Sequence, residues 1–160
     1  MNTRISVVGD AAAVLARWAL GAIFIFMGMS KALHPVEFLK LVREYELTQN
    51  PWLLNSLAGM LPWFEVVCGI LLLVGVAVRG SVLVLILMLV PFTLVILGRA
   101  LAIHSESPIP FCAVKFNCGC GGGEVFVCRK LLENVLLTIL AGWLLASRCQ
   151  KFCLRHHLMV

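Results

Sequence analysis

Residues 11–33 read AAAVLARWALGAIFIFMGMSKAL and form the first of several long apolar stretches in this 160-residue chain. A helix of this length extends about 35 Å, which is enough to cross a hydrocarbon core of about 30 Å. The apolar run carries Arg17 inside it and continues past Met29, which fits a retained membrane span better than a cleaved secretory signal. This stretch therefore predicts that the chain begins with a transmembrane helix.

The composition extends that prediction to the whole chain. It is 61% hydrophobic and only 13% charged, whereas soluble domains average about 25% charged residues. The net charge of +5 is scattered along the predicted helix ends and forms no aromatic-interleaved patch, so it does not indicate nucleic-acid binding. We expect an integral membrane protein that forms a single domain over residues 1–160.

The pattern of apolar and polar residues predicts an all-α fold, a four-helix membrane bundle with a Cys/Gly-rich loop between the third and fourth spans. An amphipathic segment after the first span is expected to form a short helix at the membrane surface. Arg79 and Gly80 are expected to form a tight turn between the second and third spans. The predicted spans are residues 11–33, 61–78, 81–103 and 125–147, with the surface helix at about 35–46 and the cysteine loop at 104–124.

One face of the first helix combines charges with small residues. Its members are spaced four, three, four and three residues apart, which aligns them along the helix. We expect this face to point inward, because glycines allow a second helix to approach closely and charges avoid lipid. Snorkelling of the two basic residues toward the membrane surfaces is the alternative. The face consists of Arg17, Gly21, Phe24, Gly28 and Lys31.

Charged residues also lie in or beside the other spans. Glu65 is a candidate functional residue, because an intramembrane carboxylate must be protonated, paired or in a polar cavity. The alternative is a structural ion pair with a basic residue of a neighbouring helix. Arg129 and Glu133 are one helical turn apart, which suits an ion pair. We expect a proton and charge cluster, of which all members but Arg17 fall at helix ends beside the cysteine loop. The cluster is drawn from Glu65, Arg17, Lys31, Arg99, Arg129, Lys130 and Glu133.

The stretch from Phe111 to Cys128, which covers most of the loop and the start of the fourth span, gathers four cysteines beside a glycine run. Cys118 and Cys120 are separated by one glycine, so a disulfide between them would be strained and easily reduced, which suits thiol exchange. Neighbouring cations would favour the thiolate form. Cys112 and Cys128 complete the set of candidate catalytic residues, and four cysteines allow three complete pairings, among which the sequence does not choose.

Two other interpretations use the same cysteines. A tetrahedral metal site could be built from Cys112, Cys118 and Cys120 with His104, although the Cys-x-Cys spacing differs from that of structural zinc sites. We therefore predict no metal. The cysteines could also serve only to brace the loop.

The chain resembles the MauE/DoxX family of small four-span bacterial membrane proteins. The resemblance rests on the face of the first span from Arg17 to Lys31 and on the Cys-Gly-Cys-Gly motif at residues 118–121. It also includes Leu61-Pro62, Glu65, Gly69 and Leu72-Leu73 of the second span. MauE proteins typically have phenylalanine where this chain has Gly121, and the resemblance does not extend to Cys112 and Cys128.

The resemblance implies a redox-associated membrane protein that works with a thioredoxin-like extracytoplasmic partner in the maturation of an exported, disulfide-containing enzyme, methylamine dehydrogenase in the best-known case. The DoxX side implies instead an accessory subunit of a membrane oxidoreductase that delivers electrons to quinone. Our leading hypothesis is a membrane thiol–disulfide relay. The alternative is an anchor or assembly subunit of a larger membrane complex, and a transporter has less support because the chain has no evident inverted repeat.

The expected location is the bacterial inner membrane, with the termini in the cytoplasm and the cysteine loop in the periplasm. The basic C-terminal tail and the oxidising environment outside the cytoplasm favour this orientation. No residue specifies a cofactor, although a quinone within the bundle would be a reasonable electron acceptor.

Overall fold

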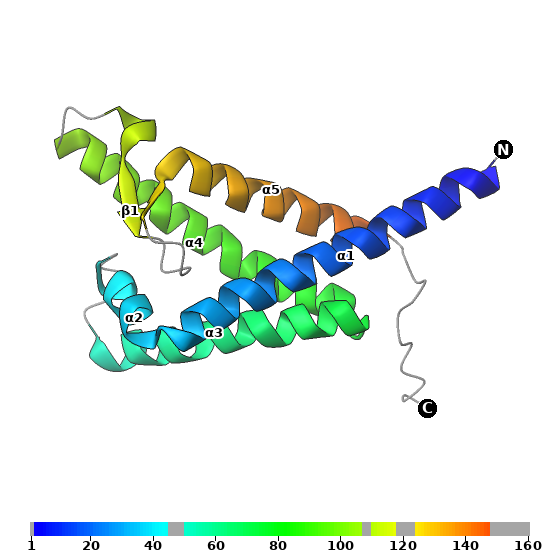
Figure 1. Ribbon diagram of the computed structural model, residues 1–160, viewed down its shortest axis with the longest axis horizontal. Coiled ribbons are helices and arrows are strands. Elements are labelled where there is room, and N and C mark those ends of the chain that lie inside the picture. Colours follow the sequence, from blue (N-terminus) through cyan, green and yellow to red (C-terminus); the bar gives the residue numbers. More distant parts are fainter. Residues whose placement is uncertain (1, 45–49, 107–109, 118–123, 148–160) are drawn as a thin grey trace.

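The computed structural model describes residues 2–44, 50–106, 110–117 and 124–147. Four long helices account for most of this part of the chain (Figure 1). They are α1 (Asn2–Leu33), α3 (Pro51–Val74), α4 (Val78–Glu106) and α5 (Val127–Ala146). The shorter elements are α2 (Pro35–Glu44), the 3-10 helix η1 (Phe111–Ala113) and the strands β1 (Lys115–Asn117) and β2 (Glu124–Phe126).

Three of the described helices are long and apolar enough to cross a membrane: α1 from Ala11, α3 from Trp52 and α4 as far as Ser105. Large apolar side chains such as Phe26 and Leu87 are exposed on their surfaces, as a bilayer requires. These features support an all-α membrane protein. The fourth predicted span corresponds to α5, which is not among these three helices and carries three charged residues in its first two turns.

Helices α1 and α3 pack closely as an antiparallel pair. A Cβ atom on Gly21 would lie 2.8 Å from the carbonyl oxygen of Gly69, and one on Gly28 would lie 2.7 Å from that of Pro62. Such distances are too short for any larger residue unless the helices move apart. The predicted inward face of α1 is therefore confirmed: its glycines contact α3, and its other members, Arg17, Phe24 and Lys31, are 2–3% exposed.

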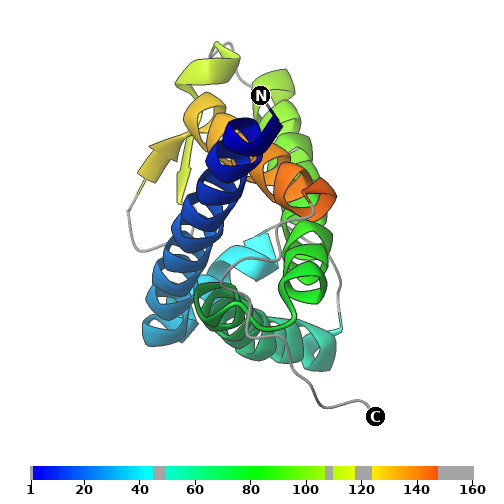
Figure 2. The same cartoon turned by 90° about the vertical axis from the view of Figure 1, so that its right-hand side faces the viewer.

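A single apolar core joins the four long helices. Leu20 of α1 and Leu72 of α3 pack with Leu85 of α4 and Leu144 of α5. Seen at right angles to the first view, α4 and α5 lie beside the α1–α3 pair (Figure 2). The core places the four helices in one unit within the described residues.

The ends of α3 differ from those expected. The helix begins at Pro51, ten residues before the predicted start at 61, because Asn50 caps it by accepting a hydrogen bond from the Trp52 N–H at 3.1 Å. It ends at Val74, since Gly75 adopts the left-handed conformation with φ of 82° and donates to the Leu71 carbonyl. The predicted turn at Arg79 and Gly80 is therefore wrong, and both residues lie in the first turn of α4.

The segments at one end of the long helices include the expected surface helix and an unexpected ribbon. Helix α2 buries Phe38 and Val42 against Leu54 and Ala58 of α3. Strands β1 and β2 pair antiparallel, and they delay the start of α5 to Val127 instead of 125. Figure 1 shows α2 and the ribbon at the same end of the helices, opposite the N-terminus and the α3–α4 connection.

Candidate functional site

Cys112 of η1 and Cys128 of α5 are joined by a disulfide, with their Cα atoms 5.0 Å apart. Beside the bond lies a buried apolar cluster, here called the base of the loop, in which Val114 and Val127 pack against Ala100 of α4. The Val127 N–H donates a hydrogen bond to the Val114 carbonyl at 3.0 Å, and the β1–β2 ribbon continues from this point. The two ends of the cysteine loop are therefore held together and fixed to α4 and α5.

The predicted exchange pair, Cys118 and Cys120, lies outside the described residues. In the sequence, residues 118–123 contain this pair and connect Asn117 of β1 to Glu124 of β2. Of the three complete pairings of the loop cysteines, the Cys112–Cys128 bond is compatible with only one. That pairing leaves Cys118 and Cys120 as each other's only partner within the loop.

Lys31 and Glu65 form an ion pair between α1 and α3. The Lys31 Nζ atom donates to Glu65 Oε1 at 2.5 Å, and the two side chains are 4% and 10% exposed. The other carboxylate oxygen, Oε2, is buried without a hydrogen-bond partner among the described residues. A pair in such surroundings is held together strongly, because an isolated charge would be costly there.

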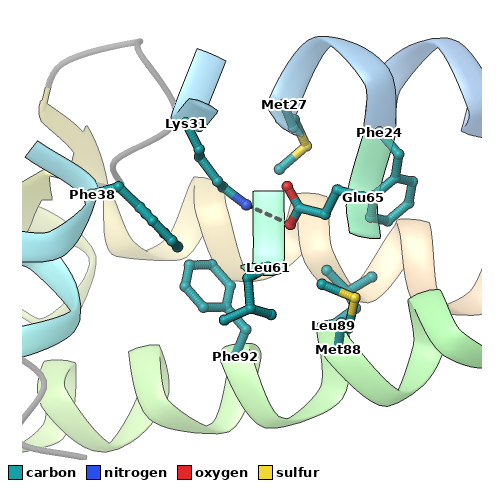
Figure 3. Close-up of a pocket in the computed structure, with 9 residues that line it drawn as sticks. All are labelled: Phe24, Met27, Lys31, Phe38, Leu61, Glu65, Met88, Leu89 and Phe92. Carbon is teal, nitrogen blue, oxygen red and sulfur yellow. Dashed lines mark hydrogen bonds and ion pairs between the residues drawn. The ribbon is translucent and has the colours of Figure 1, made fainter. Parts of the chain in front are cut away.

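Aromatic rings surround the lysine end of this pair. The Lys31 Nζ atom lies 5.5 Å from the ring centroids of both Phe38 and Phe92, within cation–π range. Figure 3 shows Lys31 and Glu65 pointing toward each other in the wall of a small cavity. The volume of this cavity is about 40 Å³. Residues of α1, α2, α3 and α4 line this cavity, which is apolar apart from the ion pair. The Lys31 ammonium thus connects four helices.

A second charged group lies at the start of α5. Arg129 Nε is 3.1 Å from Glu133 Oε1, which confirms the predicted ion pair. Lys130 Nζ is 3.6 Å from the other oxygen, Oε2, and its side chain is only 5% exposed. This group begins immediately after Cys128 and so places positive charge beside the disulfide.

The predicted cluster is therefore divided. Among the described residues, the α1–α3 pair and the α5 group form no ion pair with each other. Arg17 lies about 21 Å along α1 from Lys31, away from the Lys31–Glu65 pair. Arg99 is half-buried in α4 and directly precedes Ala100 at the base of the loop.

The alternative metal site loses one of its ligands, because the Cys112 sulfur is bonded to Cys128 and has no thiolate to offer. His104 instead makes an edge-to-face contact with Phe111, with ring centroids 6.1 Å apart. In the part of the chain that the structure describes, no three His, Cys, Asp or Glu residues are placed to hold a metal ion.

Two features of the site were missed from the sequence. No sequence signal places Phe38 and Phe92 near Lys31, since their approach to it depends on how α2 and α4 pack. Asn134 is fully buried, and its Nδ2 atom donates to Thr93 Oγ1 at 3.2 Å, linking α5 to α4. A polar amide inside an apolar helix could have drawn attention to it.

Comparison with known proteins identifies a family. The family model described as methylamine utilisation protein MauE matches residues 9–147. No curated protein and no solved structure matches the chain. Because the match covers most of its length, the chain belongs to the MauE family, and it is a multi-pass membrane protein associated with methylamine utilisation.

Proposed function

We propose that this protein is a membrane thiol–disulfide exchange protein, which works with a thioredoxin-like extracytoplasmic partner in the maturation of an exported enzyme of the methylamine-utilisation type. The observation that carries the proposal is the Cys112–Cys128 bond, which closes the loop containing Cys118-Gly119-Cys120. Family membership supplies the biological setting.

The proposed chemistry takes place at Cys118 and Cys120. A thiolate of the partner attacks one sulfur of their disulfide and forms a mixed disulfide, while the other cysteine leaves as a thiolate. The partner's second thiol then attacks its own mixed-disulfide sulfur. The partner is thereby oxidised by two electrons, and Cys118 and Cys120 are reduced and take up the two protons. The reverse sequence would reduce a partner disulfide.

The charged residues have different proposed roles. Glu133 is the better placed of the two candidate carboxylates to exchange protons, because its side chain is 45% exposed and it lies near the loop base. Glu65 is buried against Lys31, which suits a structural role for that pair. Arg99, Arg129 and Lys130 place positive charge near the base of the loop, where it would favour thiolates.

We further propose that α5 is a fourth span. Its charges lie in the first two turns, and the remaining turns carry no charged residue as far as Ala146. Four crossings put both termini on the same side of the membrane. In the proposed orientation that side is the cytoplasm of a bacterial cell, and the cysteine loop lies outside the inner membrane. A quinone in the bundle would be a suitable final acceptor, although no described residue specifies one.

The test is a Cys118→Ser, Cys120→Ser double variant expressed at wild-type abundance in cells that contain the thioredoxin-like partner. We expect turnover of the partner's disulfide to fall well below that of the wild type, because the exchange pair is gone. A matched Cys68→Ser variant, which removes the buried cysteine of α3, should leave the partner unchanged. The proposal fails if the double variant supports normal turnover of the partner.

The second candidate function is that of an anchor or assembly subunit. It is favoured by the Cys112–Cys128 bond itself, which can brace the loop, and by the Lys31–Glu65 pair between helices. A bond that closes a loop of this size stabilises the fold by about 3 kcal/mol. Under this function, loss of the bond would lower the abundance of a membrane complex, while Cys118 and Cys120 would have no exchange role.

A further inference from the structure

We propose that the Cys112–Cys128 disulfide is a second exchange site with a fixed polarity, at which a protein dithiol attacks Cys112 and Cys128 leaves as the thiolate. The inference rests on the proposed function, since the attacking dithiol is that of the thioredoxin-like partner. It assigns a chemical role to a bond that would otherwise serve only as a brace.

The two sulfur atoms of the disulfide differ in their accessibility to a partner. Cys112 is exposed, and η1, in which it lies, has no buried residue. Cys128 is half-buried between Val127, which is fully buried, and the neighbouring turn of α5, where Lys130 is 4% exposed. Because thiol–disulfide exchange depends on which sulfur the nucleophile can reach, a protein thiol meets Cys112 first.

The electrostatic environment of Cys128 favours it as the leaving sulfur. Cys128 is the second residue of α5, a 20-residue helix whose N-terminus has no side-chain cap and no acidic residue in its first turn. The partial positive charge of that helix end is therefore not neutralised by the cap residue or by a first-turn side chain, and Arg129 follows directly. Both effects stabilise a thiolate on Cys128, and a more stable thiolate leaves faster.

Cys112 lacks these advantages as a leaving group. It lies in a 3-10 helix of three residues, which has no comparable dipole. Glu133 partly offsets the charge of Arg129 and Lys130. It lies in the second turn of α5, however, and not at the N-terminal end of the helix. Access and electrostatics therefore favour the same direction of attack.

The proposed step conserves bonds, electrons and protons. A partner thiolate bonds to Cys112 Sγ, the bond between Cys112 and Cys128 breaks, and its electron pair remains on Cys128 Sγ. The partner's second thiol then forms the partner disulfide and releases Cys112. The partner loses two electrons, the Cys112–Cys128 pair gains them, and the two protons of the partner's thiols pass to Cys112, Cys128 or water.

The test uses the full-length protein in nanodiscs, with every cysteine except Cys112 and Cys128 replaced by serine. The probe is a soluble thioredoxin-fold protein that keeps only the attacking cysteine of its CxxC motif. Products are trapped by acid, alkylated and mapped by mass spectrometry. We expect the probe on Cys112 and the alkylating reagent on Cys128, in at least about tenfold excess over the reverse arrangement. Equal or reversed labelling would overturn the polarity, and reaction only after denaturation would overturn the site.

A pair of charge variants tests the electrostatic argument separately. Arg129→Glu should slow formation of the mixed disulfide by about two- to fivefold, the effect expected of a charge near a helix end. Arg43→Glu makes the same charge change on an exposed residue of α2 and should leave the rate unchanged. Equal rates for both variants would contradict the role assigned to the helix end.

The two proposals can fail independently. If the wild-type protein forms probe adducts at Cys118 or Cys120 but the two-cysteine protein forms none, only the inference about Cys112 and Cys128 is overturned. If Cys112 forms adducts while Cys118 and Cys120 never change redox state in cells, the inference stands and the proposed exchange pair is wrong.

Discussion

Lys31 and Glu65 show how a buried charge can be tolerated in an apolar helix bundle. Each side chain has the other as its ionic partner, and the Lys31 ammonium also faces two phenylalanine rings. Removing one member leaves the other charge buried without its partner, which costs more than removing both. The pair is therefore better explained as a connection between α1 and α3 than as two independent functional groups.

A double-mutant cycle tests this explanation. We expect Glu65→Leu to lower the free energy of unfolding by about 3–5 kcal/mol, because Lys31 is left charged in an apolar cavity. The Lys31→Met, Glu65→Leu double variant should recover most of that loss. Unfolding would be followed in detergent micelles by denaturant titration. If the double variant loses as much free energy of unfolding as the two single variants together, the explanation is contradicted.

An exposed pair provides the control. Arg129→Gln breaks an ion pair whose arginine side chain is 75% exposed, so it should change the free energy of unfolding by less than about 1 kcal/mol. A large effect there would mean that the loop base depends on this charge for stability.

At the scale of helices, glycines determine how closely α1 and α3 approach. A Cβ atom on Gly28 would lie 2.7 Å from the backbone oxygen of Pro62, and backbone cannot give way as a flexible side chain can. On Gly98 of α4, by contrast, an added Cβ atom would meet nothing within 4 Å. The two positions therefore predict opposite responses to the same substitution.

We expect Gly28→Ala to destabilise the protein by about 1–3 kcal/mol, since the helices must separate to admit the methyl group. Gly98→Ala should be neutral or stabilising by up to about 1 kcal/mol, because alanine favours the helix and finds room. Thermal unfolding in one detergent would compare the two variants. A Gly28→Ala protein as stable as Gly98→Ala would refute the close approach.

Part of this level of structure could be predicted from sequence. The spacing from Arg17 to Lys31 was sufficient to identify the inward face of α1, because helix periodicity aligns those residues. The start of α3 was not identified, since Pro62 inside the helix resembles a helix start and the cap at Asn50 is a local signal. The three-residue strands are too short to show alternation, and their pairing depends on the folded loop.

At the scale of the molecule, the ribbon and the α3–α4 connection lie at opposite ends of α4 (Figure 1). The sequence left the disulfide pairing open, because proximity of Cys112 to Cys128 arises only when η1 packs at the start of α5. The partner of Glu65 was also open, because several basic residues were available on neighbouring helices. The disulfide pairing and the partner of Glu65 both depend on how the helices pack in three dimensions.

The proposed topology predicts which positions are accessible from each side of the membrane. In a background that keeps only Cys112 and Cys128, an added cysteine at Lys115→Cys should react with an impermeant maleimide in cells whose inner membrane is intact. Arg79→Cys and Ser147→Cys should react only after the inner membrane is permeabilised, because α4 and α5 each cross it. If Ser147→Cys reacts from outside, α5 is not a span.

The most direct test of the central claim is the redox state of Cys118 and Cys120 in cells, fixed by acid trapping and read by mass-tag alkylation. We predict a mixture of oxidised and reduced forms that shifts within minutes of a reductant challenge and includes a trapped heterodisulfide with a thioredoxin-like protein. Thiols that remain in one state through the challenge, with no heterodisulfide, would contradict thiol–disulfide exchange and leave the assembly function as the better account.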